Sequence, residues 1–255
     1  MSLLAVQSFA AGKWIDPGAE ASPLHNAFSG ALIGHVGGAA LDVVAMRQHA
    51  ILKGGPALRS MTFHDRARML KALAQYLNER KEALYELSYM TGATRADSWI
   101  DIDGGIGTMF VFASKGRREM PDAHVYLDGD VEMLSRKGSF VGQHVCTPMQ
   151  GVALHINAFN FPVWGMLEKL APTLLAGMPA IIKPATATGY LAEAAFRMII
   201  DSGLLPPGAV QLVSGGVGPL LDYLDAQDAV SFTGSADTAM RLRSNMNLQQ
   251  HAVRF

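Results

Sequence analysis

The sequence has little of several features that mark common classes of protein. Its one cysteine, Cys146, excludes a disulfide within the chain. No apolar run approaches the ~18 residues that suggest a membrane span, and the N-terminal residues lack the basic start of a secretory signal. A formal net charge of −1 gives no electrostatic reason to expect nucleic acid or an anionic membrane as a partner. We therefore expect a cytoplasmic protein that binds neither of them.

Several catalytic motifs are also missing. The chain has no Gly-x-Ser-x-Gly nucleophile motif, no phosphate-binding loop, and no tyrosine followed by lysine four residues later. The glycine run at 215–218 lacks the spacing of the usual dinucleotide fingerprint. The eight histidines lack metal-ligand spacing, so we expect no metal site.

The first part of the chain has a helical pattern. Leu70, Leu73, Leu77, Leu84 and Leu87 recur at helical spacing, which predicts one apolar stripe on a core. The segments 62–65 (TFHD) and 94–97 (TRAD) are typical of helix starts, with a threonine placed to accept a backbone N–H. We assign residues 1–119 to a helical N-terminal part.

Residues 120–149 are more polar and strand-like, with turns expected at Asp128-Gly129 and Lys137-Gly138. This pattern predicts an extended hairpin. An exposed hairpin is prone to edge-to-edge pairing unless another subunit covers it. We therefore expect an oligomerisation arm that joins copies of the chain into a homo-oligomer.

From Gln150 onward, strand patterns alternate with helix patterns. This rhythm predicts an α/β fold in which a parallel sheet is covered on both faces. The expected strands are 151–156, 180–183, 209–213 and 229–232, and the expected helices are 162–176, 188–202, 219–224 and 235–243. Ligands of such sheets bind beyond the carboxyl ends of the strands. Four segments with polar or small residues fall there: 157–160, 183–186, 214–216 and 233–235.

These positions leave alternatives open. Asn160 stands just before the helix that Pro162 begins, so its amide either caps that helix or stabilises an oxyanion in the positive field of the helix end. The turn 232–235 (FTGS) suits a pyrophosphate or is an ordinary strand-to-helix turn. Lys183 is either a ligand-binding or a solvated strand-end lysine. Asp101 and Asp103 diverge on a helix and do not predict a catalytic acid pair, and the glycines at 104–107 predict close packing.

Three segments, 157–162 (NAFNFP), 177–185 (GMPAIIKPA) and 232–235 (FTGS), resemble the aldehyde dehydrogenase superfamily in order and spacing. The resemblance implies an aldehyde-dehydrogenase-type Rossmann-like sheet. A closer similarity, carried by 61–63, 91–99, 103–108 and 164–172, points to the dehydrogenase part of bifunctional ring-opening enzymes of phenylacetate degradation. The alternative is a resemblance to the semialdehyde dehydrogenases of benzoyl-CoA breakdown.

The resemblance also implies an activity and a set of site residues. The activity is NAD(P)-dependent oxidation of an aldehyde, a CoA-linked semialdehyde, to its acid. Asn160 would hold the oxyanion, Lys183 the adenosine ribose and Ser235 the pyrophosphate. The other residues expected at the cofactor are Ile156, Asn157, Ala158, Phe159, Ala185, Thr186, Gly215, Phe232, Thr233, Gly234 and Thr238. Residues 150–255 would be the main cofactor-binding units.

Two departures from the family pattern matter. Thr186 stands where many NAD-preferring members carry glutamate, which leads us to expect NADP in preference to NAD. The family's nucleophilic cysteine and glutamate base would lie beyond Phe255, in a catalytic domain that these residues do not include. Cys146 matches no nucleophile position, and we expect a structural thiol. The alternative is a cofactor-binding fragment or pseudoenzyme without turnover.

Overall fold

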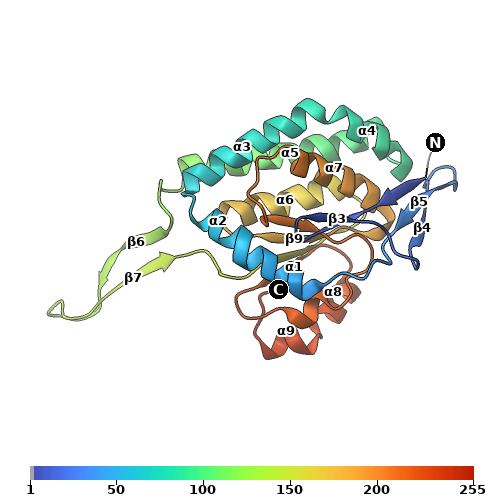
Figure 1. The fold of residues 1–255 in the computed structure, drawn as a ribbon. Helices are drawn as coiled ribbons and strands as arrows, with labels where there is room; N and C mark the ends of the chain where they lie inside the picture. The colour runs from blue at the N-terminus through green and yellow to red at the C-terminus, as the bar shows by residue number, and fades with distance from the viewer. Residues whose placement is uncertain (1–2) are drawn as a thin grey trace.

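A computed structural model describes residues 3–255, in which a central sheet lies between two sets of helices (Figure 1). Four neighbouring strands of this sheet are parallel to one another, and two antiparallel strands extend one edge. The order is β11 (Ala229–Phe232), β8 (Ala153–Ile156), β9 (Ala180–Lys183), β10 (Val210–Leu212), β2 (Ser8–Ala10) and β3 (Lys13–Ile15). The predicted α/β fold with a parallel sheet is confirmed.

The register of the parallel strands brings their carboxyl ends level with one another. Ile156 of β8 is paired with Lys183 of β9 on one side and with Phe232 of β11 on the other. The segments that follow these strands therefore leave the sheet at one edge, as the sequence predicts. All four predicted strands are present, with bounds that differ from the prediction by at most two residues.

Helices cover the sheet on both faces, each over a hydrophobic core. On one face the helices form two layers, and buried leucines such as Leu70, Leu73 and Leu77 pack against the layer that lies next to the sheet. This face carries α3 (Phe63–Arg80), α4 (Glu82–Ser88), α5 (Arg95–Arg118), α6 (Pro162–Leu175) and α7 (Gly189–Asp201). The other face carries α1 (Val43–His49), a 3₁₀ turn (Leu220–Tyr223), α8 (Ala236–Arg243) and α9 (Met246–Gln250). The short α2 (Gly55–Arg59) precedes α3.

Both helix starts predicted in the N-terminal part are confirmed. Thr62 and Thr94 each form a full capping box, with Asp65 and Asp97 respectively. One continuous helix was expected to carry the leucine stripe, but the chain forms two, α3 and α4, which meet at Lys81.

The region expected to be helical begins with strands. In the described part of the first forty residues, β1 (Leu4–Val6), β4 (Ser22–His25) and β5 (Leu32–Val36) form a three-stranded sheet, while β2 and β3 join the central sheet. β2 pairs with β10 through Phe9 and Leu212, which are far apart in the sequence. Strands of three residues are too short to show a clear alternation of apolar and polar residues, so their pattern did not predict them.

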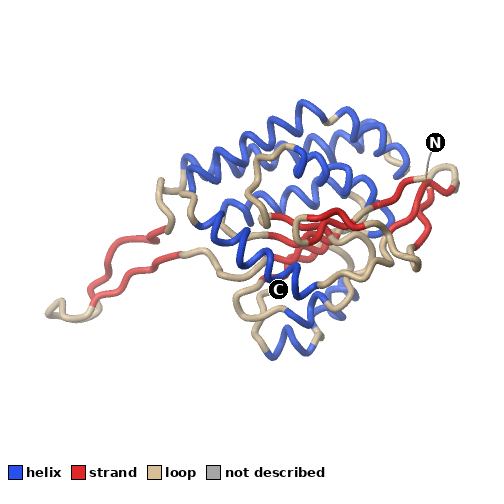
Figure 2. The backbone as a smooth tube through the Cα atoms, viewed as in Figure 1, coloured by secondary structure: helices blue, strands red, loops and turns tan. Residues whose placement is uncertain are grey.

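The predicted hairpin, called the arm below, is present as the antiparallel pair of β6 (Tyr126–Met133) and β7 (Val141–Cys146). It projects away from the body of the molecule (Figure 2). The predicted turn at Lys137-Gly138 is confirmed, since Gly138 lies between the strands with a φ of 67°. The predicted turn at Asp128-Gly129 is wrong. Gly129 has a φ of 78° inside β6, where the pairing register shifts, so its left-handed conformation forms an irregularity in the strand instead of a reversal.

Within residues 3–255, none of the helices is both long enough and apolar enough to cross a membrane. In the same residues, no cluster of three or more His, Cys, Asp or Glu side chains could hold a metal ion.

Candidate functional site

The topology creates a switch point between β8 and β11. The helices that follow these neighbouring strands, α6 and α8, lie on opposite faces of the sheet. Adjacent connections that leave toward opposite faces open a crevice at the carboxyl edge, where ligands of such sheets bind. The segments 157–160 and 233–235, both singled out from the sequence, border this point.

Backbone hydrogen bonds hold these segments together. The N–H of Thr233 donates to the carbonyl of Ile156 over 2.9 Å, and the N–H of Asn157 donates to the carbonyl of Lys183 over 3.0 Å. The segment 214–216 lies one strand further along the sheet. It connects to the group through the Thr186 hydroxyl, which donates to the Gly215 carbonyl over 3.4 Å. All four predicted segments therefore share one edge.

Asn157 has a buried side chain whose polar atoms are not satisfied. The residue is 4% exposed, and within residues 3–255 neither Oδ1 nor Nδ2 has a hydrogen-bond partner. Its Cβ faces Gly165 in the first turns of α6, where the missing side chain leaves room. A buried amide is costly without partners. Water or ligand atoms at this edge would supply them.

Lys183 ends β9 with a half-buried side chain. Burial lowers the pKa of its amine, and among the described residues no carboxylate pairs with it. The side chain therefore brings an uncompensated positive charge to the edge. Ala185 and Thr186 follow it, both half-buried.

Gly215 has a structural reason to be glycine. Its φ is 105°, and a Cβ there would lie 2.6 Å from the Cα of Gly37. Close packing against Gly37 is therefore enough to require it, whether or not a ligand approaches.

The turn into α8 is exposed at Thr233, Gly234 and Ser235. Ser235 is the N-cap: its hydroxyl oxygen accepts a hydrogen bond from the N–H of Thr238 over 3.3 Å. The ring of Phe232 fills the space that a side chain on Gly234 would need. The turn is thus a regular strand-to-helix connection whose small residues leave its backbone accessible.

Asn160 is exposed and does not cap α6. The N-cap position belongs to Phe161, which makes no capping side-chain bond. Instead, the carboxylate of Asp101 on α5 accepts hydrogen bonds from the N–H groups of Val163 and Trp164, over 3.1 and 2.7 Å. The capping alternative for Asn160 is therefore wrong. The Asp101 charge also offsets the positive field expected at this helix end.

Sequence reasoning missed Asp101 as a site residue. It is 4% exposed, and burial raises its pKa to about 6 although the hydrogen bonds from Trp164 and Val163 act in the opposite direction. The available signal was the spacing of Asp101 from Gly104 and Gly105, which puts the carboxylate on the same, buried face of the helix as the two glycines. The predicted divergence of Asp101 and Asp103 is confirmed, since Asp103 pairs with Lys81 and Tyr85 instead.

A hollow of about 570 Å³ lies beside the crevice, between α5, α6 and β11, and includes Trp164, Lys169 and Thr233. His155 of β8 faces it and is 1% exposed, with Nε2 3.0 Å from the hydroxyl of Thr173 and no partner for Nδ1 within residues 3–255. Burial, and secondarily the charge of Lys169, lowers the pKa of His155 to about 3. The imidazole is therefore neutral near pH 7.

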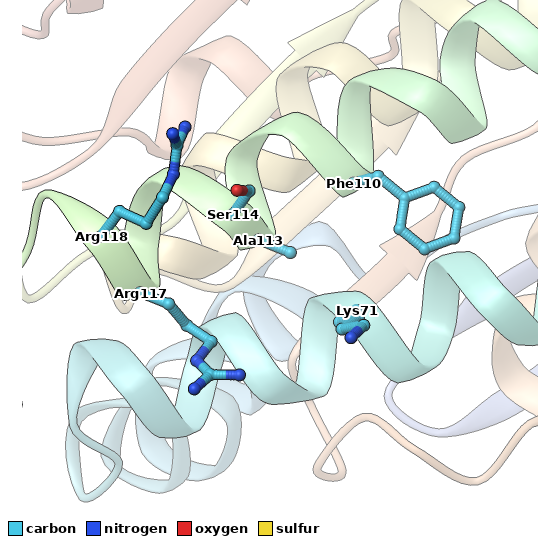
Figure 3. A pocket seen from close by; sticks show the side chains of 6 residues that line it. All are labelled: Lys71, Phe110, Ala113, Ser114, Arg117 and Arg118. Atoms are coloured by element: carbon cyan, nitrogen blue, oxygen red, sulfur yellow. The ribbon is translucent and has the colours of Figure 1, made fainter.

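A second hollow, of about 390 Å³, lies in the outer helical layer. Figure 3 shows that Lys71 comes from α3, whereas Arg117, Arg118 and Ser114 come from the last turns of α5. Asp101 lies at the opposite end of α5. This basic hollow is therefore separate from the crevice.

An open parallel sheet with a crevice at its switch point is the arrangement of nucleotide-binding α/β proteins. Residues 14–254 match the model of the aldehyde dehydrogenase family, so the chain belongs to that family. It is 40% identical to a 3,4-dehydroadipyl-CoA semialdehyde dehydrogenase of Aromatoleum evansii, over 96% of this chain and 47% of that protein. The chain thus spans about half the length of the curated relatives it matches.

Solved structures show the same fold. A point mutant of betaine aldehyde dehydrogenase from Staphylococcus aureus, in complex with NAD⁺, has a TM-score of 0.79 at 25% identity and is matched over 98% of this chain and 50% of its own. The NADP-dependent glyceraldehyde-3-phosphate dehydrogenase of Bacillus halodurans, complexed with NADP, has a TM-score of 0.79 at 23% identity, over 94% of this chain and 50% of its own.

Proposed function

We propose that this chain provides the cofactor crevice and the oxyanion donor of an NAD(P)-dependent aldehyde dehydrogenase. The substrate is a CoA-linked semialdehyde of aromatic catabolism, oxidised to its acid, in the cytoplasm. The observation that carries the proposal is the convergence of segments 157–160, 183–186 and 233–235 at one switch point. The substrate class is supported by the 40% identical relative, a 3,4-dehydroadipyl-CoA semialdehyde dehydrogenase.

The residues at the crevice fit a dinucleotide. The uncompensated cation of Lys183 suits an anionic, ribose-bearing ligand, and the unsatisfied amide of Asn157 offers an NH2 group that donates and an oxygen that accepts. The exposed turn before α8 suits a pyrophosphate. The remaining lining is assigned to Ile156, Ala158, Phe159, Ala185, Thr186, Gly215, Phe232, Thr233, Gly234 and Thr238. The nicotinamide, when bound, serves as the hydride acceptor.

Asn160 acts on the aldehyde oxygen. When a nucleophile adds to the aldehyde carbon, the carbonyl oxygen takes up negative charge, and an N–H donor placed at it lowers the barrier. The Asn160 amide is exposed and does not cap α6, so its NH2 group can donate a hydrogen bond to the aldehyde oxygen. We assign no nucleophilic role to Cys146, which is exposed on β7 of the arm. In this proposal the nucleophile and the base belong to the half of the family's length that the chain does not span.

The arm joins copies of the chain. Its exposed apolar side chains, among them Val131, Phe140 and Val145, have no cover within the described residues. Such a surface on a two-stranded hairpin is stabilised when a second copy packs on it.

We further propose that the crevice prefers NADP, because Thr186 leaves room for a 2′-phosphate where a carboxylate would repel it. Titration of the wild-type chain and the Thr186→Glu variant with NADP and NAD tests this. The variant is expected to lose about tenfold in NADP affinity relative to NAD, since like charges repel and solvent screens part of that repulsion. Thr186→Gln, of similar size but neutral, should keep the wild-type ratio. Equal affinities for both cofactors in the wild type would contradict the preference.

The activity itself is tested by two measurements. Cofactor titration of residues 1–255 tests the crevice, and NADP reduction by an enzyme of the family's full length that contains this chain tests the dehydrogenase, with a CoA semialdehyde as substrate. Binding with turnover supports the proposal. Binding without turnover favours the alternative, a cofactor-binding protein without its own chemistry, and no binding rejects both.

A further inference from the structure

We propose that Asp101 is a positioning residue for Asn160. In this view α5 holds the first turn of α6 through one carboxylate and two glycine contacts, and so fixes the segment from which the Asn160 amide extends. The inference rests on the proposed role of Asn160 as oxyanion donor.

The first observation concerns the hydrogen-bond partners of the first N–H groups of α6. The first N–H groups of a helix have no partner within it and need acceptors. Pro162 has no N–H, and the next two groups, of Val163 and Trp164, both donate to Asp101, a residue 62 positions before Val163. The N–H of Gly165 then makes the first bond of the helix, to the carbonyl of Phe161 over 2.8 Å. The first turn is complete without any contribution from Asn160.

The second observation is the close contact of the two helices at the same place. Gly104 and Gly105 follow Asp101 by three and four residues, so all three lie on one face of α5. A Cβ on Gly104 would lie 2.8 Å from the Trp164 ring, and one on Gly105 would lie 2.9 Å from the Trp164 Cα. The glycines thus let α5 approach α6 closely enough for a side chain as short as aspartate to reach its N–H groups.

Gly107 provides a contrast within the same glycine run. A Cβ there would meet no atom within 4 Å. The requirement for glycine is therefore confined to the two positions that face Trp164, and Gly107 supplies a matched control.

The third observation concerns the segment that carries Asn160. On one side, the Thr188 hydroxyl donates to the carbonyl of Phe159 over 3.0 Å. On the other side, Phe161 leads into the turn that Asp101 holds. Within residues 3–255 the Asn160 side chain makes no hydrogen bond of its own, so the backbone on either side sets its position. Capping would tie the amide oxygen of Asn160 to the N–H groups of α6 and so fix the orientation of the amide; without that bond, the amide is not turned toward the helix.

The role of Asp101 is positional and not electrostatic. An ionised carboxylate at a helix N-terminus offsets the positive end of the helix, which by itself disfavours a nearby oxyanion. Asparagine at position 101 keeps a side-chain oxygen that accepts the same two hydrogen bonds and removes the charge. Alanine removes both. The two variants therefore separate position from charge.

Amide hydrogen exchange on the chain of residues 1–255 tests the hold on α6. In Asp101→Ala the N–H groups of Val163 and Trp164 should exchange about tenfold or more faster, while those of α3 keep their wild-type rates. Asp101→Asn should restore slow exchange, and Gly107→Ala should leave it unchanged. Unchanged exchange at Val163 and Trp164 in Asp101→Ala overturns the inference. So does equal acceleration in every helix, which would mean a general loss of stability.

Turnover by an enzyme of the family's full length tests the effect on Asn160. Asp101→Ala should lower kcat about 10- to 100-fold, as expected when a reacting geometry shifts by a fraction of an ångström, with the cofactor Kd within twofold of wild type. Asp101→Asn should restore kcat to within about threefold. If Asn160→Ala lowers kcat and Asp101→Ala does not, the positioning role alone is rejected. If Asn160→Ala has no effect on kcat, the oxyanion role proposed above is rejected, and the positioning role with it.

Discussion

Two helix starts flank the switch point, and they are completed in different ways. α8 is capped by Ser235, which precedes it directly in the sequence, through a bond to the N–H of Thr238. α6 is capped by Asp101, which belongs to a different helix in the layer above. One cap is exposed and local, and the other is buried and long-range.

This difference separates two tasks. The α8 turn keeps small exposed residues and an accessible backbone, which suits the binding of an anion. At the α6 start a carboxylate accepts the first N–H groups, and its charge disfavours an anion there. Two similar strand-to-helix connections at one sheet edge thus differ in their accessibility to an anion according to what caps them.

The largest effect on turnover is expected at Asn160, which lies just before the α6 start. In an enzyme of the family's full length, Asn160→Ala should lower kcat by a factor on the order of 10²–10³, because one oxyanion donor is lost. Steady-state kinetics with the CoA semialdehyde measures this, with Asn78→Ala, an exposed asparagine on α3, as the control. A kcat equal to that of the wild type would show that Asn160, the residue positioned before α6, is not needed for the reaction.

The buried cap predicts a dependence of stability on pH. Burial raises the pKa of Asp101 to about 6 in the folded chain, above the ~3.9 of an unfolded aspartate. The folded state therefore binds the proton more tightly, and stability falls as pH rises from about 4 to about 6, by about 3 kcal/mol in all. Denaturant unfolding at pH 4, 5, 6 and 7 should show this fall in the wild type and not in Asp101→Asn. Parallel pH curves for the two proteins would contradict the burial of a charge at this helix start.

The smallest effect is expected at the local cap. Ser235→Ala should cost about 1 kcal/mol of stability, as is usual for a lost N-cap, and should weaken cofactor binding as well. Asn245→Ala removes an equivalent local cap, that of α9, away from the crevice. It should cost a similar amount of stability and leave the cofactor Kd unchanged. Equal Kd values for the two variants would remove the functional distinction drawn for the α8 turn.

Much of the site was predictable because its signals are local. The capping threonines 62 and 94, the proline that begins α6 and Gly177 just after its end are encoded within a few residues. The strand ends that carry Asn157, Lys183 and Thr233 followed from the alternation of strands and helices. The parallel sheet then brings such ends to one edge.

The features that were missed depend on distant partners. β2 is a strand because it pairs with β10, about two hundred residues later, and three residues alone carry no clear period. Gly129 looks like a turn residue by type, and only the pairing of β6 with β7 makes it an irregularity within a strand. In both cases the partner strand decides the conformation.

The sequence by itself determined the family, the order of strands and helices, and the edge at which the crevice forms, because local periods and short motifs encode them. Only the tertiary structure decided which residue closes α6. Any buried oxygen brought to a helix start can accept its N–H groups, and the contact that brings Asp101 there depends on glycines in α5 facing Trp164. Because of that contact Asn160 does not cap α6, and no sequence pattern near Asn160 predicts this.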